Sequence, residues 1–551
     1  MLNFSYRFLI TLFVLTTINV FEIGAQVMRD WVQTHNGTAN GDDVANAIAV
    51  DQAGNVYITG YSTENGAGRS YTTIKYNSLG VEQWAAVYNG PSSYLYGDEG
   101  LDIAVDDSGN VYVTGSSAAG STEYTLDYAT IKYNSSGVEQ WVAIYNSPVN
   151  EQDIAFAIEL DDEGNVYVTG QSGHPALNAN IATIKYNSSG EEQWAAEFDG
   201  TGNWDTGKDL VVDDMGNVYV TGFFSIDWGT AYLNFITLKY DSQGNQQWAQ
   251  GYNGTGNNSD QATAIDLDLS GNIYITGHST GTVYDIATIK YDPSGNQQWL
   301  QIYSSSSPSI DVPNDLVVDA AGNVFIAAAV SLNFGTIKYN TDGVIQWDKI
   351  YNYSGNFDAA NSIAIDDEGN VYVTGVSHGG TLENTSDYAT IKYSQSGDEL
   401  WVERYNGTAN NWDAATSIAV DNLGNVLVTG FTTENNNYNY GTIKYTETIT
   451  GIQESTNKSA DVYSLFQNYP NPFNPSTKIG FRIADFGFVS LKVYDVIGNE
   501  VSILVNEELS PGEFEVEFMP ATGNLQLSSG IYFYQLKAGN FLETKMMILA
   551  K

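Results

Sequence analysis

The chain has 551 residues, of which 13% are aromatic and 16% are charged, and its formal net charge is −44. This charge excludes the basic surface by which proteins bind nucleic acid, and it opposes attachment to an anionic membrane surface. The absence of cysteine excludes disulfides, thiol catalysis and cysteine-ligated metals. Of the charged residues, 55 of the 65 acidic and 14 of the 21 basic ones precede Lys458. We interpret this acidity as a source of solubility outside the cell, with cation binding as the alternative.

The first 25 residues have the pattern of a secretion signal. Arg7 precedes the apolar run FLITLFVLTTINV at 8–20, and the small residues of IGA at 23–25 offer a cleavage point before Gln26. The alternative is an uncleaved membrane anchor, but the run is short for a bilayer span. No later segment is apolar enough to cross a membrane, so we expect the mature chain to have no membrane span.

Residues 26–446 contain one unit that occurs eight times, at intervals of 47 to 55 residues. A phrase D-x-x-G-N-[VI] begins at Asp51, Asp106, Asp161, Asp213, Asp268, Asp319, Asp366 and Asp421. A phrase T-[IL]-K-Y begins at Thr73, Thr130, Thr183, Thr237, Thr288, Thr336, Thr390 and Thr442. A tryptophan recurs at Trp31, Trp84, Trp141, Trp194, Trp248, Trp299, Trp347 and Trp401. Repeats of about this length are typical of solenoids and propellers.

Each unit contains four strand-like runs. In the second unit these are LDIAVD at 101–106, VYVTG at 111–115, YATIKYN at 128–134 and VEQWVAIYN at 138–146. They are rich in β-branched and aromatic residues, as strands are. The turns DSGN and SSG supply an Asp that accepts backbone hydrogen bonds and Gly or Asn residues that adopt positive φ. We therefore predict a four-stranded antiparallel sheet for each unit.

The two ends of the repeat array distinguish a propeller from a solenoid. The first tryptophan run, at Trp31, has no T-[IL]-K-Y run before it, and the last such run, in GTIKYTE at 441–447, has no tryptophan run after it. The phrase NGTAN follows both Trp31 and Trp401, so an N-terminal strand can complete the last sheet. A solenoid needs capping units, and the sequence shows none. We predict an all-β fold with an eight-bladed β-propeller of four-stranded blades, its ring closed by the N-terminal strand.

Two charged positions recur in every unit. An aspartate stands eight residues before each repeat Asp, at Asp43, Asp98, Asp153, Asp205, Asp260, Asp311, Asp358 and Asp413. The lysines of T-[IL]-K-Y are Lys75, Lys132, Lys185, Lys239, Lys290, Lys338, Lys392 and Lys444. We interpret both sets as structural, each lysine pairing with an aspartate of its own or the next blade. The alternative is an acidic ring that binds a cation near the channel.

The connections between strands point to a binding face. The turns after the repeat Asp and after T-[IL]-K-Y are short and uniform, whereas the other two connections of each unit vary in length and content. Strand direction places all variable loops on one face, which we predict to be the binding surface. Aromatic side chains beside carboxylates and Asn suit sugar stacking and polar recognition. The candidate ligand-binding residues are Tyr94, Tyr96, Trp204, Trp228, Phe357 and Trp412.

No catalytic, cofactor-binding or metal-binding residue is predicted. The four histidines show no ligand or triad spacing, and no nucleophile elbow, HExxH motif or phosphate loop occurs. Calcium is kept as an alternative ligand of the carboxylates. The run YNSSGVEQW at 133–141 is similar to the quinoprotein repeat, which leaves a quinone-dependent enzyme as an alternative.

The C-terminal part of the chain has a different pattern. After a polar linker at 447–467, we predict a small immunoglobulin-like β-sandwich at 468–551. The run VSLKVYDVIGNEVSILV at 489–505 reads as a hairpin, and GEFEVEFMP at 512–520 alternates between apolar and charged residues. The domains expected are thus a signal peptide at 1–25, a propeller at 26–446, the linker and the sandwich.

Two resemblances support this division. IAVDDSGNVYVTG and YATIKYNSSGVEQW resemble the bacterial β-propeller repeat family whose name refers to seven blades, although the units here number eight. NYPNPFNPSTKI, VYDVIGNEV and SGIYFYQL closely resemble the C-terminal sorting domain of the type IX (Por) secretion system. The second resemblance implies a bacterium of the Bacteroidetes type, the type IX machinery as a partner, and a secreted or outer-surface location.

These observations together predict an exported propeller that acts as a non-catalytic binding scaffold. Its ligand, a glycan or a protein, would bind on the variable-loop face. The alternatives are an extracellular enzyme on the same face, either polysaccharide-cleaving or quinone-dependent, and a passive structural protein of the cell surface.

Overall fold

The computed structural model describes residues 26–550, apart from short stretches in loops and a longer stretch between the two parts of the chain. The stretches outside the description are 67, 92–96, 120–124, 149–150, 174–178, 201–203, 227–231, 282, 306–309, 354–356, 379–384, 449–462, 474–475, 485–486, 497–498, 510, 519–528 and 540. The signal peptide expected at 1–25 also lies outside the described residues. The chain divides into two compact units at Ile449/Thr450. All regular structure in the described residues is β-strand. These residues contain no helix that is long and apolar enough to cross a membrane.

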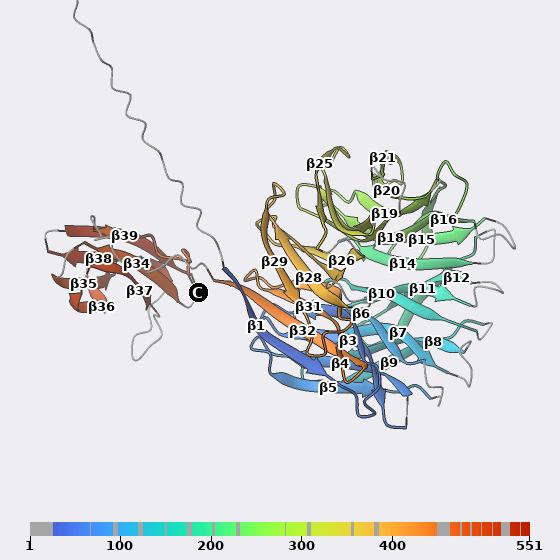
Figure 1. Ribbon diagram of the computed structural model, residues 1–551, viewed down its shortest axis with the longest axis horizontal. Helices are drawn as coiled ribbons and strands as arrows, with labels where there is room; N and C mark the ends of the chain where they lie inside the picture. Colours follow the sequence, from blue (N-terminus) through green and yellow to red (C-terminus); the bar gives the residue numbers. More distant parts are fainter. Residues whose placement is uncertain are drawn as a thin grey trace, which may run out of the picture. The chain divides into compact units, whose positions relative to one another are not determined.

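The first unit consists of four-stranded antiparallel sheets that follow one another along the chain (Figure 1). Sheet 1 is β2 (Val44–Val50), β3 (Val56–Glu64), β4 (Gly68–Tyr76) and β5 (Glu82–Tyr88). Sheet 2 is β6 (Glu99–Val105), β7 (Val111–Ala118), β8 (Leu126–Tyr133) and β9 (Glu139–Tyr145). Sheet 3 is β10 (Ile154–Leu160), β11 (Val166–Ser172), β12 (Asn180–Tyr186) and β13 (Glu192–Phe198). Sheet 4 is β14 (Asp205–Val212), β15 (Val218–Ser225), β16 (Leu233–Tyr240) and β17 (Gln246–Tyr252).

The same order continues toward the C-terminal side of this unit. Sheet 5 is β18 (Gln261–Leu267), β19 (Ile273–Thr280), β20 (Tyr284–Tyr291) and β21 (Gln297–Tyr303). Sheet 6 is β22 (Asp311–Val318), β23 (Val324–Val330), β24 (Asn333–Tyr339) and β25 (Ile345–Tyr351). Sheet 7 is β26 (Asp358–Ile365), β27 (Val371–His378), β28 (Ser386–Tyr393) and β29 (Glu399–Tyr405).

Sheet 8 joins the two ends of the unit. It contains β30 (Ala414–Val420), β31 (Val426–Glu434), β32 (Asn437–Thr448) and, as its fourth strand, β1 (Gln26–His35). Strand β1 pairs antiparallel with β32, with Trp31 opposite Lys444, as the adjoining blue and orange strands of Figure 1 show. The tryptophan strand expected to complete the last unit therefore comes from the N-terminal side of the chain.

The cores of the first unit lie between neighbouring sheets. The middle strands are buried on both faces, as in β7, whereas the outermost strand alternates between exposed and half-buried residues, as in β5. Tyr57 and Tyr71 of sheet 1 pack with Val111 and Ile131 of sheet 2 in one hydrophobic cluster. The first strand of each sheet, here called its inner strand, contacts the inner strands of its neighbours, and β2 contacts β30. Sheet-on-sheet burial of this kind explains why the valine, isoleucine and tyrosine positions recur in every unit.

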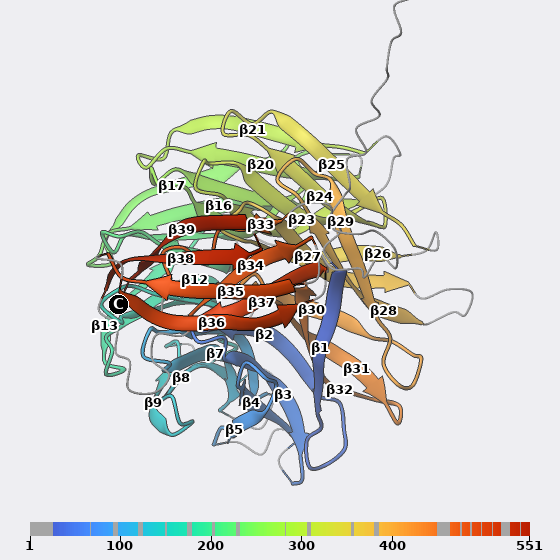
Figure 2. The ribbon, with the colours of Figure 1, turned by 90° about the vertical axis from the view of Figure 1, so that its left-hand side faces the viewer.

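The second unit is a pair of β-sheets with a shared core (Figure 2). One sheet contains β33 (Ser464–Leu465), β34 (Thr477–Ile483) and β37 (Gly512–Phe518). The other contains β36 (Glu500–Leu509), β35 (Gly487–Tyr494), β38 (Gly530–Ala538) and β39 (Phe541–Leu549) in that order. Alternate residues such as Phe481, Leu491 and Tyr534 point into the core, which is the period-two pattern of half-buried strands.

The segment NYPNPF at 468–473 covers the outer edge of the last strand. The backbone N–H of Phe473 donates to Ile548 O at 2.9 Å, and the N–H of Ala550 donates to Phe473 O at 3.0 Å. The Ile548 N–H donates to the side-chain oxygen of Asn471 at 2.8 Å. These bonds satisfy backbone groups that an edge strand otherwise presents to other chains.

Candidate functional site

One end of every sheet, here called the turn end, is built from tight turns at the repeat Asp. In sheet 1 the Asp51 carboxylate accepts the backbone N–H of Ala53 and of Asn55, each at 2.9 Å, and the Tyr57 hydroxyl at 2.8 Å. Gly54 completes the turn with φ of +74°. Burial alone would raise the pKa of Asp51, but these hydrogen bonds prevail and lower it below its ordinary value. The repeated phrase is thus a hairpin turn, as the sequence predicts.

The repeat lysines and tryptophans clamp neighbouring sheets together at the turn end. Lys75 and Trp84 lie opposite each other on β4 and β5. Lys75 Nζ and Trp84 Nε1 both donate to Ser135 O in the next sheet, each at 3.2 Å. In five further pairs the lysine and the tryptophan likewise share one backbone carbonyl of the next sheet. These pairs are Lys132 and Trp141, Lys239 and Trp248, Lys290 and Trp299, Lys338 and Trp347, and Lys444 and Trp31. Each junction therefore fixes the register of one sheet against the next.

One junction of this clamp uses a carboxylate. After β32 the chain leaves sheet 8, so no turn joins β32 to β1. Here Lys392 Nζ and Trp401 Nε1 of sheet 7 donate to Glu447 Oε1, at 2.6 and 2.7 Å. Glu447 thus supplies the oxygen that a turn carbonyl supplies at the other junctions.

The aspartates eight residues before each repeat Asp anchor the opposite end, here called the loop end. Asp43 accepts the backbone N–H of Gly37 at 2.7 Å and of Thr63 at 2.6 Å. The equivalent aspartates of the other sheets bind two backbone amides in the same way. All eight are buried, and burial raises the pKa of Asp43 and Asp205 to about 6. Each carboxylate therefore holds two variable connections of its sheet in place.

Ion pairs are expected between each repeat lysine and an aspartate of its own or the next blade; in the described residues Lys185 and Lys290 form such pairs, and neither pair involves a loop-end aspartate. The lysines lie at the turn end and the aspartates at the loop end, so the two sets satisfy separate groups. Lys185 and Lys290 do approach an aspartate, but it is the turn residue Asp161 or Asp268, at 4.0 and 3.9 Å. Most repeat lysines also lie over an aromatic ring of their own sheet, as Lys75 Nζ does 4.9 Å from the Tyr57 centroid.

Three of the candidate ligand-binding residues lie in the described part of the chain, at equivalent positions. Trp204, Phe357 and Trp412 each immediately precede a loop-end aspartate, and they are 36%, 48% and 48% exposed. Trp204 packs edge-to-face on Phe223 at 5.4 Å between ring centroids. Tyr94, Tyr96 and Trp228 lie outside the described residues.

Sequence reasoning missed a second group of side chains, the inner carboxylates. These are Asp102, Glu159, Asp209, Asp266 and Asp315, all on inner strands. Asp102 Oδ2 accepts the N–H of Ile158 on the next inner strand at 2.9 Å, and Asp209 does the same for Ile265. They escape a search for recurring residues because they occur in only some units, two or four residues before the repeat Asp. An alignment of the eight units would have shown them.

The inner carboxylates are electrostatically unfavourable as a group. Burial, helped by the neighbouring Asp102 and Asp266 charges, raises the pKa of Glu159 to about 7. Burial likewise raises the pKa of Asp102, Asp266 and Asp315 to about 6. Within the described residues, no group of three or more His, Asp or Glu side chains is arranged to hold a metal ion. The inner carboxylates thus connect inner strands through hydrogen bonds, and they concentrate negative charge in one region of the protein.

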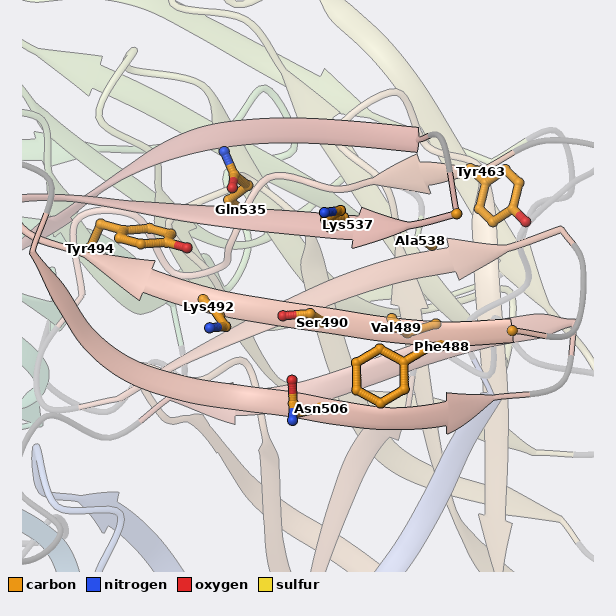
Figure 3. A pocket seen from close by; sticks show the side chains of 12 residues that line it. Tyr463, Phe488, Val489, Ser490, Lys492, Tyr494, Asn506, Gln535, Lys537 and Ala538 are labelled. Carbon is orange, nitrogen blue, oxygen red and sulfur yellow. The ribbon is translucent and has the colours of Figure 1, made fainter.

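A shallow groove of about 640 Å³ crosses the outer face of the four-stranded sheet in the second unit. Figure 3 shows Ser490, Lys492 and Tyr494 along β35, with Lys537 on β38 and Asn506 on β36. Lysines, amides and aromatic rings of this kind can bind polar or acidic groups. This groove could not be predicted from the sequence, because most of its residues occupy ordinary outward-facing strand positions.

Comparison with known proteins agrees with the division of the chain. Residues 36–66, 92–120 and 346–383 match the beta-propeller repeat family, and residues 467–550 match the secretion system C-terminal sorting domain. An uncharacterized WD repeat-containing protein of Acanthamoeba polyphaga mimivirus is 23% identical over an alignment of 464 residues, and the match covers 65% of this chain. The match covers 31% of that protein, so the chain spans about a third of the length of this relative.

Solved structures of low identity also align with the chain. A protein of unknown function from Dyadobacter fermentans is 8% identical and covers 77% of this chain and 99% of its own, with a TM-score of 0.37. An ulvan lyase of polysaccharide lyase family PL25 is 12% identical and covers 68% of this chain and 95% of its own, with a TM-score of 0.36. Likeness at this level bears on neither activity nor ligand.

The four-stranded sheets and the two family matches define the class of protein. The first unit contains repeats that match the beta-propeller repeat family, and its four-stranded antiparallel sheets have the form of propeller blades. The chain ends in a secretion system C-terminal sorting domain of the Por type, and the protein is therefore secreted or located on the outer cell surface.

Proposed function

We propose that the eight four-stranded sheets of the first unit, as formed by its described residues, are the blades of one closed ring, followed by an immunoglobulin-like sandwich. Contact between β2 and β30 supports closure, as do hydrogen bonds from sheet 8 to sheet 1. Thr416 Oγ1 donates to Ala45 O at 2.8 Å, and Lys444 Nζ donates to Ser78 O at 3.0 Å. The inner carboxylates then line the central channel of the ring. Closure protects every sheet edge except that of the outermost strands.

We propose further that the propeller is a non-catalytic binding scaffold whose ligand, a glycan or a protein, binds at the loop end. The observation that carries this proposal is the equivalence of Trp204, Phe357 and Trp412, which are exposed aromatics fixed beside a buried aspartate. A side chain next to an anchored backbone loses little further freedom when a ligand binds, so its contact area contributes efficiently to affinity. Exposed rings held in this way suit stacking against sugars or apolar side chains.

Export is the part of the function assigned to the second unit. The sorting domain implies interaction with the type IX secretion machinery. The groove with Lys492 and Lys537 is a second surface on this unit, at the sheet face opposite the core. We propose that the sandwich delivers the propeller and takes no part in ligand binding at the loop end.

An extracellular enzyme is the second candidate function. The inner carboxylates favour it, because a carboxyl group with a pKa near neutrality can act as an acid or base. Their hydrogen bonds to neighbouring inner strands favour the structural role, since a catalytic carboxylate must reach its substrate. A passive surface role is the remaining alternative.

A binding screen with a turnover assay separates these functions. The exported protein is applied to a glycan array and to soluble polysaccharides, with calcium and with chelator, and reducing ends are measured in parallel. Binding without released reducing ends, lost in the variant with Trp204, Phe357 and Trp412 all changed to Ala, is the expected result. Released reducing ends would favour the enzyme, and binding unaffected by the triple change would contradict a loop-end site. Leu423→Ala, at an exposed leucine of the turn end, is the matched control.

A further inference from the structure

The loop end of sheets 6, 7 and 8 carries a set of exposed apolar side chains, here called the loop-end arc. It consists of Ile310, Leu332, Tyr353, Phe357 and Trp412, which are 45% to 55% exposed. Ile310, Phe357 and Trp412 occupy one repeat position, the residue before a loop-end aspartate, in three consecutive sheets. Units 1, 2, 3 and 5 have Asp42, Gly97, Gln152 and Ser259 at this position. The arc is therefore a local departure from the repeat.

Hydrogen bonds between adjacent residues connect the members of the arc. Ser331 N–H donates to Ile310 O at 3.2 Å, and the N–H of Asp358 donates to Leu332 O at 2.8 Å. These two bonds bring the backbones of Ile310, Leu332 and Phe357 together. Tyr353 joins them because its N–H donates to Asp358 Oδ2 at 3.3 Å.

Arg404 links Tyr353 to the last member of the arc. Its guanidinium lies 3.8 Å from the centroid of the Tyr353 ring. The same group donates to Asp387 Oδ2 at 2.8 Å and to Ser377 O at 3.1 Å. Asp387 follows Ser386, which bridges to Trp412. Arg404 thus holds one face of the Tyr353 ring while the side chain stays 55% exposed.

Leu332 occupies a conformation that leucine rarely adopts. Ser331 and Leu332 form the two-residue turn between β23 and β24, with φ of +51° and +65°. In the corresponding turn of sheet 8 these positions are Asn435 and Asn436, which tolerate positive φ. A leucine in the left-handed region lowers the folding stability by about 1 kcal/mol. Residues with such backbone strain cluster at functional sites. The turn therefore favours a role for the Leu332 side chain at the surface.

We propose that the loop-end arc binds a linear, uncharged polysaccharide, an inference that rests on the proposed loop-end binding function. Stacking residues at one repeat position in successive sheets fit a polymer that presents its own apolar faces at intervals, as the pyranose rings of a polysaccharide do. A net charge of −44 opposes an acidic polymer, and the five side chains of the arc have no carboxylate to pair with a cationic one, so the polysaccharide proposed is uncharged. Tyr353, fixed by Arg404, and Phe357 and Trp412, fixed by their aspartates, supply preorganised stacking platforms.

Affinity electrophoresis of the full-length exported protein tests this proposal. The gels contain laminarin, xyloglucan, galactomannan or arabinoxylan as neutral polymers, and alginate as the acidic one. We expect retardation by at least one neutral polymer and none by alginate. Phe357→Ala and Trp412→Ala should each weaken the binding about tenfold, the loss of one stacking contact. Trp204→Ala, outside the arc, should change it less than about twofold.

Leu332→Asn provides a test that misfolding cannot mimic. This variant should raise the melting temperature, because Asn tolerates positive φ, and still weaken binding severalfold. Failure of all four neutral polymers to retard the protein, or retardation unchanged by Phe357→Ala and Trp412→Ala, would overturn the inference. Binding lost only in Trp204→Ala, or binding of alginate alone, would also overturn it while leaving a loop-end ligand site in place.

Discussion

The turn end and the loop end of the propeller are built from the same repeat but differ in what the repeat fixes. At the turn end, Lys75, Trp84 and most of their equivalents meet a carbonyl of the next turn, and Glu447 supplies the acceptor oxygen for Lys392 and Trp401, so the junctions closely resemble one another. At the loop end only the aspartate anchors are shared, and the residues around them differ from sheet to sheet. The comparison teaches that repeated residues build the ring, whereas departures from the repeat provide the surface available to a ligand.

The largest expected effect comes from glycines at the two ends. Gly137 at the turn end has φ of +79°, and a Cβ there would lie 2.5 Å from the Trp84 ring. Gly66 at the loop end has φ of +83° with nothing within 4 Å. Gly137→Ala should cost about 2–4 kcal/mol, from backbone strain and overpacking together. Gly66→Ala should cost about 1 kcal/mol, from strain alone. Thermal unfolding measures the stability of both variants, and equal losses of stability would contradict the difference between the two ends.

The junction between sheets 7 and 8 offers a smaller effect that concerns ring closure. Glu447→Ala removes the acceptor of both Lys392 and Trp401, which should cost about 2–3 kcal/mol. Glu447→Gln keeps one oxygen and should lose less. Glu399→Ala, at an exposed glutamate of sheet 7, should change stability by less than about 0.5 kcal/mol. Hydrogen exchange of β1 localises the effect, and unchanged protection of β1 in Glu447→Ala would count against this closing contact.

The inner carboxylates predict a dependence of stability on pH. Their folded-state pKa values are raised, to about 7 for Glu159 and about 6 for Asp102 and Asp315, so the folded state binds more protons than the unfolded state at pH 5 to 7. Stability should therefore rise as pH falls from 8 to 5, with a gain in melting temperature of about 2–4 °C. The loop-end Asp43 and Asp205 act in the same direction.

Variants identify the source of this pH effect. Combined Asp102→Asn and Asp315→Asn should flatten the profile between pH 5 and 7, because Asn does not titrate. The turn aspartates, such as Asp51, have lowered pKa values and destabilise the fold only at more acidic pH. A melting temperature that falls steadily from pH 8 to 5 would contradict the electrostatic interpretation.

Much of the fold could be predicted from the sequence because its determinants are local. The phrase at Asp106 predicts a turn, and this turn lies between β6 and β7, whose β-branched and tyrosine residues are typical of strands. The all-β class and the four-stranded antiparallel sheets are confirmed. Strand β7 reaches Ala118, beyond the predicted end at residue 115, because pairing with Leu126 continues the ladder into residues of low strand propensity.

Side-chain partners could not be predicted in the same way. The recurrence of Lys75 and Asp43 shows that both are needed, but not that they satisfy groups at opposite ends of a sheet. The membership of Leu332 and Tyr353 in the loop-end arc can be recognised only from their exposure and from the backbone conformation of Leu332. Phe357 and Trp412 were predicted because aromatics in variable loops are conspicuous, but their shared position beside an anchored aspartate required the structure.

Two adjacent residues test the central claim most directly. Phe357 departs from the repeat, and Asp358 belongs to it, with its carboxylate accepting the N–H of His378 at 2.8 Å. The measurement pairs the melting temperature with retardation by the neutral polysaccharide that the wild-type protein binds. Phe357→Ser should leave the melting temperature unchanged and weaken retardation about tenfold, whereas Asp358→Ala should lower the melting temperature by several degrees because buried amides lose their acceptor. A destabilised Phe357→Ser protein, or an Asp358→Ala protein of unchanged stability, would contradict the division between residues that build the ring and residues that bind.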